Sequence, residues 1–337
     1  MSTDQIIKRI DFLLKEANFN TLVFSEFTNN KSKFCFDLLV KKNDLIFTVK
    51  VFANIDNLNN DIIKDIKALS ILLNAKPILV GIKNRYQNLD DNTIYVRNDL
   101  PFVNIKTLET ILKHGSYPHI LARRGGGITF LDGNKMKTIR EHKEISRKEM
   151  SEKIGVTKRT ICAYENESMH PSQKIALKIL DILEDNSLFR KINVFEWNIK
   201  FSIDREALLI EDELNPFESH LQDIIKDIGL SSYWIKKGQV PFKLSLYSSS
   251  LNLNKENEFY PLFSGVSDEK TKINEMNLKC LYLFAKLFQK KGVFIVNNNF
   301  KIPEAIMSNK IPFISIKSLE QIDDEEEFIE FIQDVKK

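Results

Sequence analysis

The side chains whose types and spacing indicate the clearest chemistry lie between residues 145 and 165. Ser146 and Glu149 stand three positions apart, as in the capping box that satisfies free backbone N–H groups at the start of a helix. Thr157 is a second cap residue, and the cations Lys158 and Arg159 follow it directly. This chemistry is hydrogen bonding to exposed amides, and it predicts two helix starts about eleven residues apart.

The elements that position these groups are two short helices joined by a tight turn. Gly155 offers the left-handed backbone conformation that ends a helix without steric penalty. Met150 and Ile154 form an inward stripe on the first helix, and Ile161 and Tyr164 point inward from the second. Two capped helices around a glycine turn predict a helix-turn-helix.

The segment from about residue 135 to 184 resembles the Cro/C1-type (XRE) helix-turn-helix family. The resemblance implies that the second helix enters the major groove of double-stranded DNA. It assigns base contacts to Lys158, Arg159, Cys162 and Ala163. It assigns phosphate contacts to Arg147, Thr160 and Asn166.

Two further family positions concern structure. Arg140 matches a residue that pairs with the acid at Glu165, so we expect this pair to hold the preceding helix to the second one. Glu167 stands where the family often has glycine, which predicts a different loop path from Asn166 to Pro171 and weakens the assignment of a phosphate contact to Asn166.

The first 118 residues predict the element order α-β-β-β-α-β. This order resembles the core of the PD-(D/E)xK nuclease superfamily, whose chemistry needs two acids and a lysine around a divalent ion. Asp37 and Lys50 match the first acid and the lysine, but Thr48 replaces the second acid. The resemblance therefore implies a degenerate remnant without catalysis. An unrelated α/β domain with Asp37 and Lys50 on its surface is the alternative.

An internal echo connects the two ends of the chain. Residues 100–111, LPFVNIKTLETI, reappear without gaps as residues 311–322, IPFISIKSLEQI. The echo predicts that two divergent copies of one α/β domain flank the helical unit. The expected domains are a nuclease-like domain at 1–118, a Gly-rich bridge at 119–134, the helix-turn-helix domain at 135–189 and the second copy at 190–337.

Within the bridge, Gly125, Gly126 and Gly127 lack the Lys-Ser/Thr of a phosphate-binding loop, which favours a flexible linker. Arg123 and Arg124 beside them either reach a phosphate or minor groove or are simply solvated.

Bulk composition narrows the class of protein. The net charge is only +3, so any nucleic-acid contact should be local. The three cysteines are widely spaced, which predicts a reducing cytoplasm, no disulfide framework and no zinc site. No apolar run is long enough for a signal or a membrane span, and no cofactor motif is present.

The wider layout resembles the archaeal HTH-type transcriptional regulatory proteins. This resemblance implies a cytoplasmic, non-enzymatic transcription regulator that binds double-stranded DNA, and we expect a homodimer because two-fold pairing doubles the contacts. The effector is unknown. Two alternatives stay open: a metal-dependent nuclease targeted by the helix-turn-helix, and a non-catalytic DNA-binding or chromatin scaffold.

Overall fold

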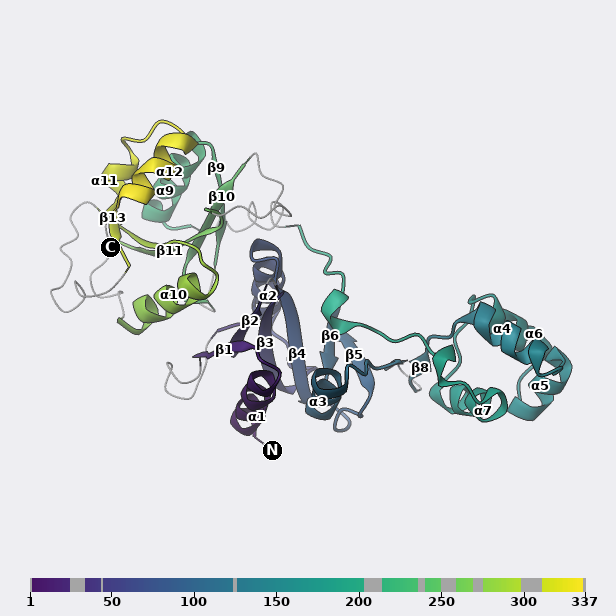
Figure 1. The fold of residues 1–337 in the computed structure, drawn as a ribbon. Helices are drawn as coiled ribbons and strands as arrows, with labels where there is room; N and C mark the ends of the chain where they lie inside the picture. The colour runs from purple at the N-terminus through teal and green to yellow at the C-terminus, as the bar shows by residue number, and fades with distance from the viewer. Residues whose placement is uncertain are drawn as a thin grey trace. The chain divides into compact units, whose positions relative to one another are not determined.

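The computed structural model describes residues 2–24, 34–43, 45–123, 126–202, 214–235, 240–249, 259–268, 275–297 and 311–335 (Figure 1). The chain divides into two compact units. One comprises residues 1–17, 51–57 and 78–198, and the other comprises residues 18–50, 58–77 and 199–337. Strand β3 contributes residues to both.

The N-terminal elements build a sheet with hydrogen-bonding order β1-β2-β3-β4-β6-β5-β7-β8. Strands β1, β2 and β3 pair antiparallel, whereas β4 and β6 pair parallel. The bounds are α1 Thr3–Glu16, β1 Asn20–Val23, β2 Leu38–Lys42, β3 Leu45–Asn54, α2 Asn60–Leu72, β4 Lys76–Lys83, β5 Thr93–Arg97, β6 Leu100–Val103 and α3 Ile105–His114. The order α-β-β-β-α-β predicted from the sequence is therefore observed.

The segment expected to be a Gly-rich linker is partly a β-ladder. Strands β7 (Ile120–Leu121) and β8 (Ile128–Thr129) pair antiparallel, and β7 also pairs parallel with β5. The chain returns beside them, because Arg190 N donates to Phe130 O at 2.9 Å and Ile192 N donates to Pro118 O at 2.7 Å. Arg124 and Gly125 lie outside the described residues. The helical domain is thus joined to the sheet by two passes of chain.

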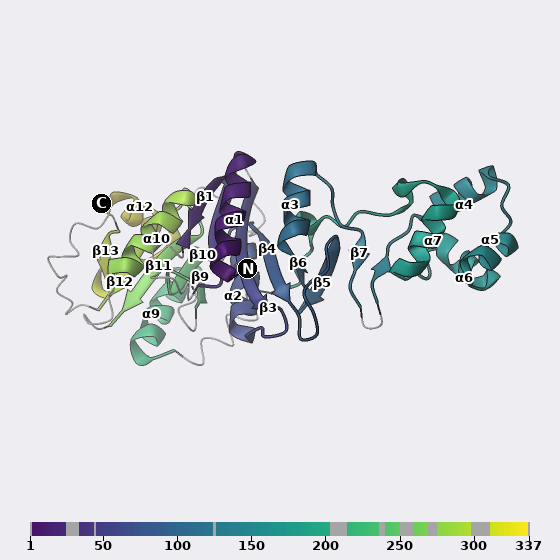
Figure 2. The ribbon, with the colours of Figure 1, turned by 90° about the horizontal axis from the view of Figure 1, so that it is seen from below.

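Four helices form the bundle at the end of this ladder (Figures 1 and 2). They are α4 Gly133–His142, α5 Arg147–Ile154, α6 Lys158–Glu165 and α7 Gln173–Leu183. Short 3-10 turns follow at Asn186–Leu188 and Val194–Glu196. The buried core of the bundle consists of Leu131, Met136, Met150, Ile154, Ile161, Tyr164, Ile179, Leu183 and Leu188. The apolar stripes read from the sequence face this core.

The C-terminal region forms a second sheet with order β13-β12-β11-β10-β9. Strands β9, β10 and β11 pair antiparallel, and β11, β12 and β13 pair parallel. The bounds are α9 Pro216–Asp227, β9 Leu230–Trp234, β10 Leu244–Ser248, β11 Leu262–Ser267, α10 Glu275–Leu287, β12 Gly292–Val296, β13 Phe313–Ser315, α11 Ile316–Leu319 and α12 Glu325–Asp334. The elements therefore repeat the N-terminal order of α-β-β-β-α-β.

The two similar segments, residues 100–111 and 311–322, occupy equivalent strand-to-helix corners of the two sheets. In the first, Asn104 follows β6 and accepts a hydrogen bond from Thr107 N to cap α3. In the second, Ser315 ends β13 and accepts from Ser318 N to cap α11. The same strand-to-helix corner thus accounts for the repeated spacing. None of the described helices combines the length and the apolar character needed to cross a bilayer.

Candidate nucleic-acid interface

Helix α6 begins and ends as its sequence predicts. Thr157 Oγ1 accepts from Thr160 N at 3.1 Å and lies 2.9 Å from Thr160 Oγ1. Gly155 ends the preceding helix α5 with a left-handed φ of 83°. The turn between α5 and α6 is therefore three residues long, from Gly155 to Thr157, and is conformationally fixed.

The cap of α5 differs from the expected capping box. Ser146 Oγ accepts from Glu149 N at 3.1 Å, as predicted. The Glu149 carboxylate instead pairs with Lys153 Nζ at 3.0 Å, one turn further along the helix. A nearby cation one turn away thus replaces the reciprocal bond to the cap.

One face of α6 is buried and the opposite face is open. Ile161, Tyr164 and Glu165 are buried. Because successive residues are about 100° apart on a helix, Arg159, Cys162, Ala163 and Asn166 fall on the opposite side. Arg159 and Asn166 are exposed there, and Cys162 and Ala163 are half-buried.

The remaining predicted contact residues flank this face. Lys158 is exposed and Thr160 is half-buried at the first turn of α6. The Asn166 amide donates to Cys162 Sγ at 3.5 Å, so both side chains belong to one small polar surface. The side chains of Lys158 and Arg159 have no hydrogen-bond or ion-pair partner within the described part of the chain. Their cationic groups are therefore available to an external acceptor.

A buried ion cluster fixes the three helices that position α6. Glu165 accepts from Arg140 Nε at 2.6 Å through Oε1 and from Arg147 Nε at 2.7 Å through Oε2. The Glu165 side chain is fully buried, and only 6% of the Arg140 side chain is exposed. Arg140 also donates to Ile145 O at 2.8 Å. The cluster joins α4, α5 and α6 in one defined geometry.

Arg147, which the sequence predicts to contact a phosphate, also has a partner inside the bundle. Its Nε serves Glu165, and 33% of its side chain is exposed. The sequence did not indicate this second partner, because Arg147 and Glu165 are 18 residues apart. Arg147 therefore has a structural role whether or not its outer nitrogens also meet a phosphate.

The loop after α6 contains the departure noted at Glu167. Glu167 adopts a left-handed φ of 56°, the conformation that glycine would favour. Its carboxylate accepts from Gly133 N at 3.1 Å and from Arg190 Nη2 at 2.5 Å. These bonds hold a non-glycine residue in that conformation.

Gly133 is a functional position that the sequence reasoning missed. A Cβ placed there would lie 2.2 Å from Glu165 O and 2.7 Å from Tyr164 O, so α4 begins directly against the end of α6. Only glycine permits this approach. The signal available in the sequence was Asp132-Gly133 before a helix, with Asp132 now seen capping α4.

The nuclease-like site contains an internal ion pair. Lys50 Nζ donates to Asp37 Oδ1 at 2.8 Å and to Phe34 O at 2.7 Å, and Asp37 is buried. Thr48 is also buried and stands two residues before Lys50 on β3, hence on the same face. A hydroxyl is a poor replacement for a carboxylate ligand of Mg²⁺ or Mn²⁺. The residues present therefore do not fit a two-acid metal site.

The equivalent position of the C-terminal sheet has the opposite charge. Asp37 N donates to Val49 O, and Lys243 N donates to Ser264 O in the same arrangement of strands. Lys243 Nζ pairs with Glu218 of α9. Phe36, next to Asp37, packs on Phe284 of α10 with ring centroids 5.9 Å apart. Neither sheet presents the acid pair that metal-dependent cleavage requires at these positions.

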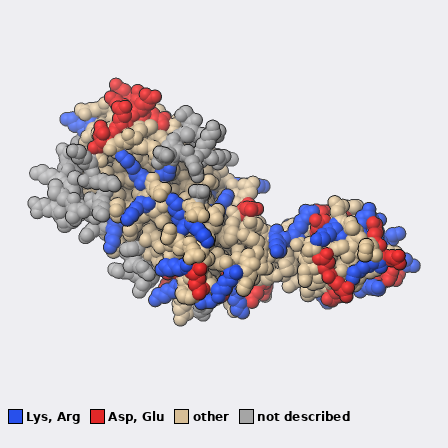
Figure 3. All heavy atoms as spheres, viewed as in Figure 1, with Lys and Arg blue, Asp and Glu red and all other residues tan. Residues whose placement is uncertain are grey.

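Surface charge is mixed rather than uniformly basic. Figure 3 shows Lys and Arg side chains interleaved with Asp and Glu over the helical bundle. It also shows acidic side chains gathered over α12, whose first turn holds Glu325, Glu326 and Glu327. A weak overall field means that an anionic partner must be held by specific local contacts.

Comparison with known proteins defines the two recognisable parts. Residues 3–118 match the model of a PD-(D/E)XK superfamily domain. Residues 136–186 match the model of a helix-turn-helix family. The chain thus combines a nuclease-like α/β domain, a helix-turn-helix domain and a second sheet domain.

The whole chain is similar to archaeal proteins provisionally named HTH-type transcriptional regulatory proteins. One from Pyrococcus horikoshii is 27% identical over 336 residues, covering 100% of this chain and 99% of the relative. One from Methanobrevibacter smithii is 28% identical over 344 residues, with 100% and 99% coverage. One from Methanocaldococcus jannaschii is 27% identical over 301 residues, with 89% and 88% coverage. No solved structure matches the chain.

Proposed function

We propose that this protein is a transcription regulator that binds double-stranded DNA sequence-specifically through α6. The observation that carries the proposal is the exposed, cationic face of α6, a short helix whose buried face is held by the ion cluster around Glu165. Helix α6 has 8 residues, and an α-helix with its side chains is about 10–12 Å across, which fits a major groove about 12 Å wide. The names of the full-length relatives support the same function.

Base reading is assigned to the outward residues of α6. Arg159 and Lys158 would donate to guanine O6 and N7, and Ala163 and Cys162 would contact a thymine methyl. Thr160 and Asn166 lie at the edges of this surface and would meet phosphates. Arg147 would add a phosphate contact only through the nitrogens not used by Glu165.

The test is a comparison of specific and random duplexes after genome-wide mapping of bound fragments. Arg159→Ala should weaken binding to the mapped site by about 1–3 kcal/mol, roughly 5- to 150-fold, and relax one base preference. Lys137→Ala is the matched control, because Lys137 is an exposed cation on α4 rather than α6. An equal loss in both variants, or an equal loss on random duplex, would contradict base reading by Arg159.

We further propose a homodimer on a near-palindromic site. A single helix of 8 residues contacts few base pairs, and two-fold pairing doubles the contacts on half-sites one helical turn apart. Sedimentation of the free protein and of the DNA complex measures this directly. One protomer bound per mapped site would contradict it.

The outer α/β domains are proposed to be divergent copies of one scaffold without nuclease activity. The support is the replaced acid at Thr48, the Asp37–Lys50 ion pair and the repeated element order. Supercoiled plasmid incubated with Mg²⁺ or Mn²⁺ should stay intact. Cleavage by the wild type that disappears in Asp37→Ala would establish the nuclease function instead.

A further inference from the structure

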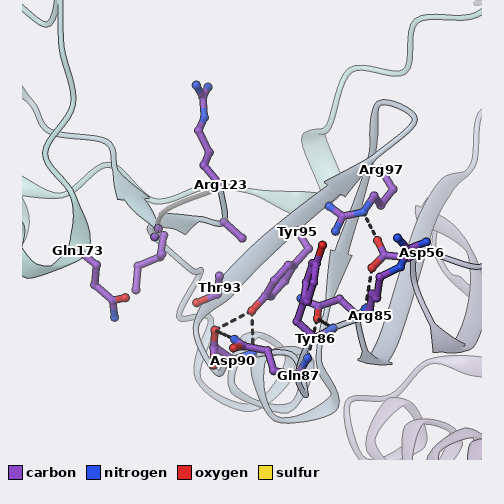
Figure 4. A pocket seen from close by; sticks show the side chains of 15 residues that line it. Asp56, Arg85, Tyr86, Gln87, Asp90, Thr93, Tyr95, Arg97, Arg123 and Gln173 are labelled. Atoms are coloured by element: carbon purple, nitrogen blue, oxygen red, sulfur yellow. Dashed lines mark hydrogen bonds and ion pairs between the residues drawn. The ribbon is translucent and has the colours of Figure 1, made fainter.

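A pocket of about 840 Å³ lies beside the stem of the helix-turn-helix domain, by which we mean the β7–β8 ladder (Figure 4). Its walls come from the segment after β3 that holds Asp56, from the connection between β4 and β5, from β5 itself, from the β7–β8 ladder and from the first residue of α7. All of these segments belong to one compact unit of the chain. The volume falls in the range of about 300–1,000 Å³ typical of small-molecule sites.

Both acidic groups of the pocket already have hydrogen-bond partners in its wall. Asp56 accepts from Arg97 Nε at 2.6 Å and from Arg85 N at 2.7 Å. Burial alone would raise the pKa of Asp56, but these hydrogen bonds outweigh it and hold the pKa below its ordinary range. Asp90 Oδ2 accepts from the Tyr95 hydroxyl at 2.7 Å and from Gln87 Nε2 at 3.0 Å. A cation balances the charge of Asp56, whereas Asp90 has only neutral donors and keeps its charge, so the anionic part of a ligand would have to lie away from Asp90.

The groups that remain open are an aromatic ring and cations. Tyr86 is 86% exposed, which is unusual for a ring in a rigid segment. Its loop is rigid because Asn84 Oδ1 accepts from both Tyr86 N and Gln87 N at 2.8 Å. Arg123 is exposed on the ladder side, and its guanidinium has no hydrogen-bond or ion-pair partner among the described residues. The Arg85 guanidinium adds a second exposed cation.

We propose that this pocket binds a small anion that carries a planar ring, a nucleoside phosphate being the simplest member of the class. The ring would stack on Tyr86, and the phosphates would meet the guanidinium groups of Arg85 and Arg123. Gln173, whose side chain also lines the pocket, supplies an amide for a ring edge or a sugar hydroxyl. A recessed site suits such a ligand better than the convex backbone of a duplex.

The ligand would contact both the sheet and the stem of the helical domain. Tyr86 and Arg85 lie on the sheet side, whereas Arg123 and Gln173 lie on the ladder and on α7. Occupancy would therefore favour one orientation of the helical domain and change DNA affinity. This regulatory consequence rests on the proposed function, but ligand binding itself does not.

The experiment is isothermal titration of the full chain with ATP and with GTP, in the absence of DNA. Binding of at least one nucleotide should be at least 10-fold weaker in Tyr86→Ala and in Arg123→Gln, both exposed positions where substitution leaves the core intact. Adenosine and tripolyphosphate, which supply the ring or the charge alone, should bind at least 10-fold more weakly than the nucleotide. Arg159→Gln is the control and should leave nucleotide affinity unchanged.

Three results would overturn the proposal. The first is absence of binding by both nucleotides, and the second is nucleotide affinity unchanged in both pocket variants. The third is tripolyphosphate binding as tight as that of the nucleotide and insensitive to Tyr86→Ala. If the pocket variants instead lose only duplex affinity, the surface belongs to DNA. Duplex binding measured without nucleotide tests the proposed function separately, so the two failures are distinguishable.

Discussion

At the scale of single residues, the structure contains charges whose partners are far away in the chain. Glu167, Arg147 and Lys50 all have partners that local sequence patterns do not indicate. The helix caps Thr157, Ser146 and Asn104, by contrast, each accept a hydrogen bond from the backbone N–H three residues further on. Such caps follow local sequence patterns, and those at Thr157 and Ser146 were predicted from the sequence. Locality therefore decides which side-chain roles a sequence alone can predict.

Asp65 on α2 should make stability depend on pH. Burial, and secondarily the charge of Asp61, raise the pKa of Asp65 to about 7 in the folded protein. As pH rises above about 4 the unfolded chain ionises while folded Asp65 stays protonated, so stability falls until about pH 7 and is constant above it. Asp65→Asn should therefore stabilise the protein at pH 8, by up to about 4 kcal/mol from linkage, and have little effect near pH 4.

Urea unfolding of the wild type and the variant at several pH values measures this difference. Asp61→Asn is the control, because it removes only the smaller contribution and should flatten the pH dependence slightly. Parallel stability curves for the wild type and Asp65→Asn would mean that Asp65 ionises normally in the folded state.

At the scale of elements, the helical bundle depends on a single carboxylate. Among the described residues, Glu165 is the only acid that pairs with both Arg140 and Arg147. Glu165→Gln should destabilise the domain by about 3–5 kcal/mol, because it removes the buried counter-charge of Arg140 and leaves only the exposed Glu141 to pair with it. Thermal unfolding followed by circular dichroism, with Glu149→Gln on the exposed face as control, measures the loss.

The affinity for DNA should separate this structural effect from recognition. At temperatures where Glu165→Gln is still folded, its base preference should be that of the wild type, since the outward residues of α6 are unchanged. An altered base preference without loss of stability would indicate that Glu165 does not act as a clamp.

Elements were predicted better than the surfaces they create. The periodicity of Met150, Ile154 and Ile161 identified the buried faces, and all three residues are fully buried. The pocket could not be predicted, because Asp56, Tyr86 and Arg123 come from segments whose meeting depends on strand order. Strand order is a non-local property that apolar periodicity does not contain.

At the scale of the whole molecule, the bundle is inserted into the sheet domain rather than appended to it. Leu131 and Phe189 form an isolated antiparallel bridge, so the points where the chain leaves and re-enters are adjacent. Replacing residues 131–188 with a short Gly-Ser linker should leave a folded chain that has lost DNA binding. Hydrogen exchange of β4 and β5 measures this outcome, and complete loss of their protection would contradict it.

Such double anchorage has a mechanical consequence. A domain held by one pass of chain can rotate about it, whereas a domain held by two hydrogen-bonded passes resists twisting and mainly bends in one plane. The helix-turn-helix domain would then approach the duplex from a narrow range of directions. In a dimer, that restriction would mean that the β7–β8 ladder and the chain paired with it set the distance between the two helix-turn-helix domains. They would thereby also set the permitted spacing between half-sites.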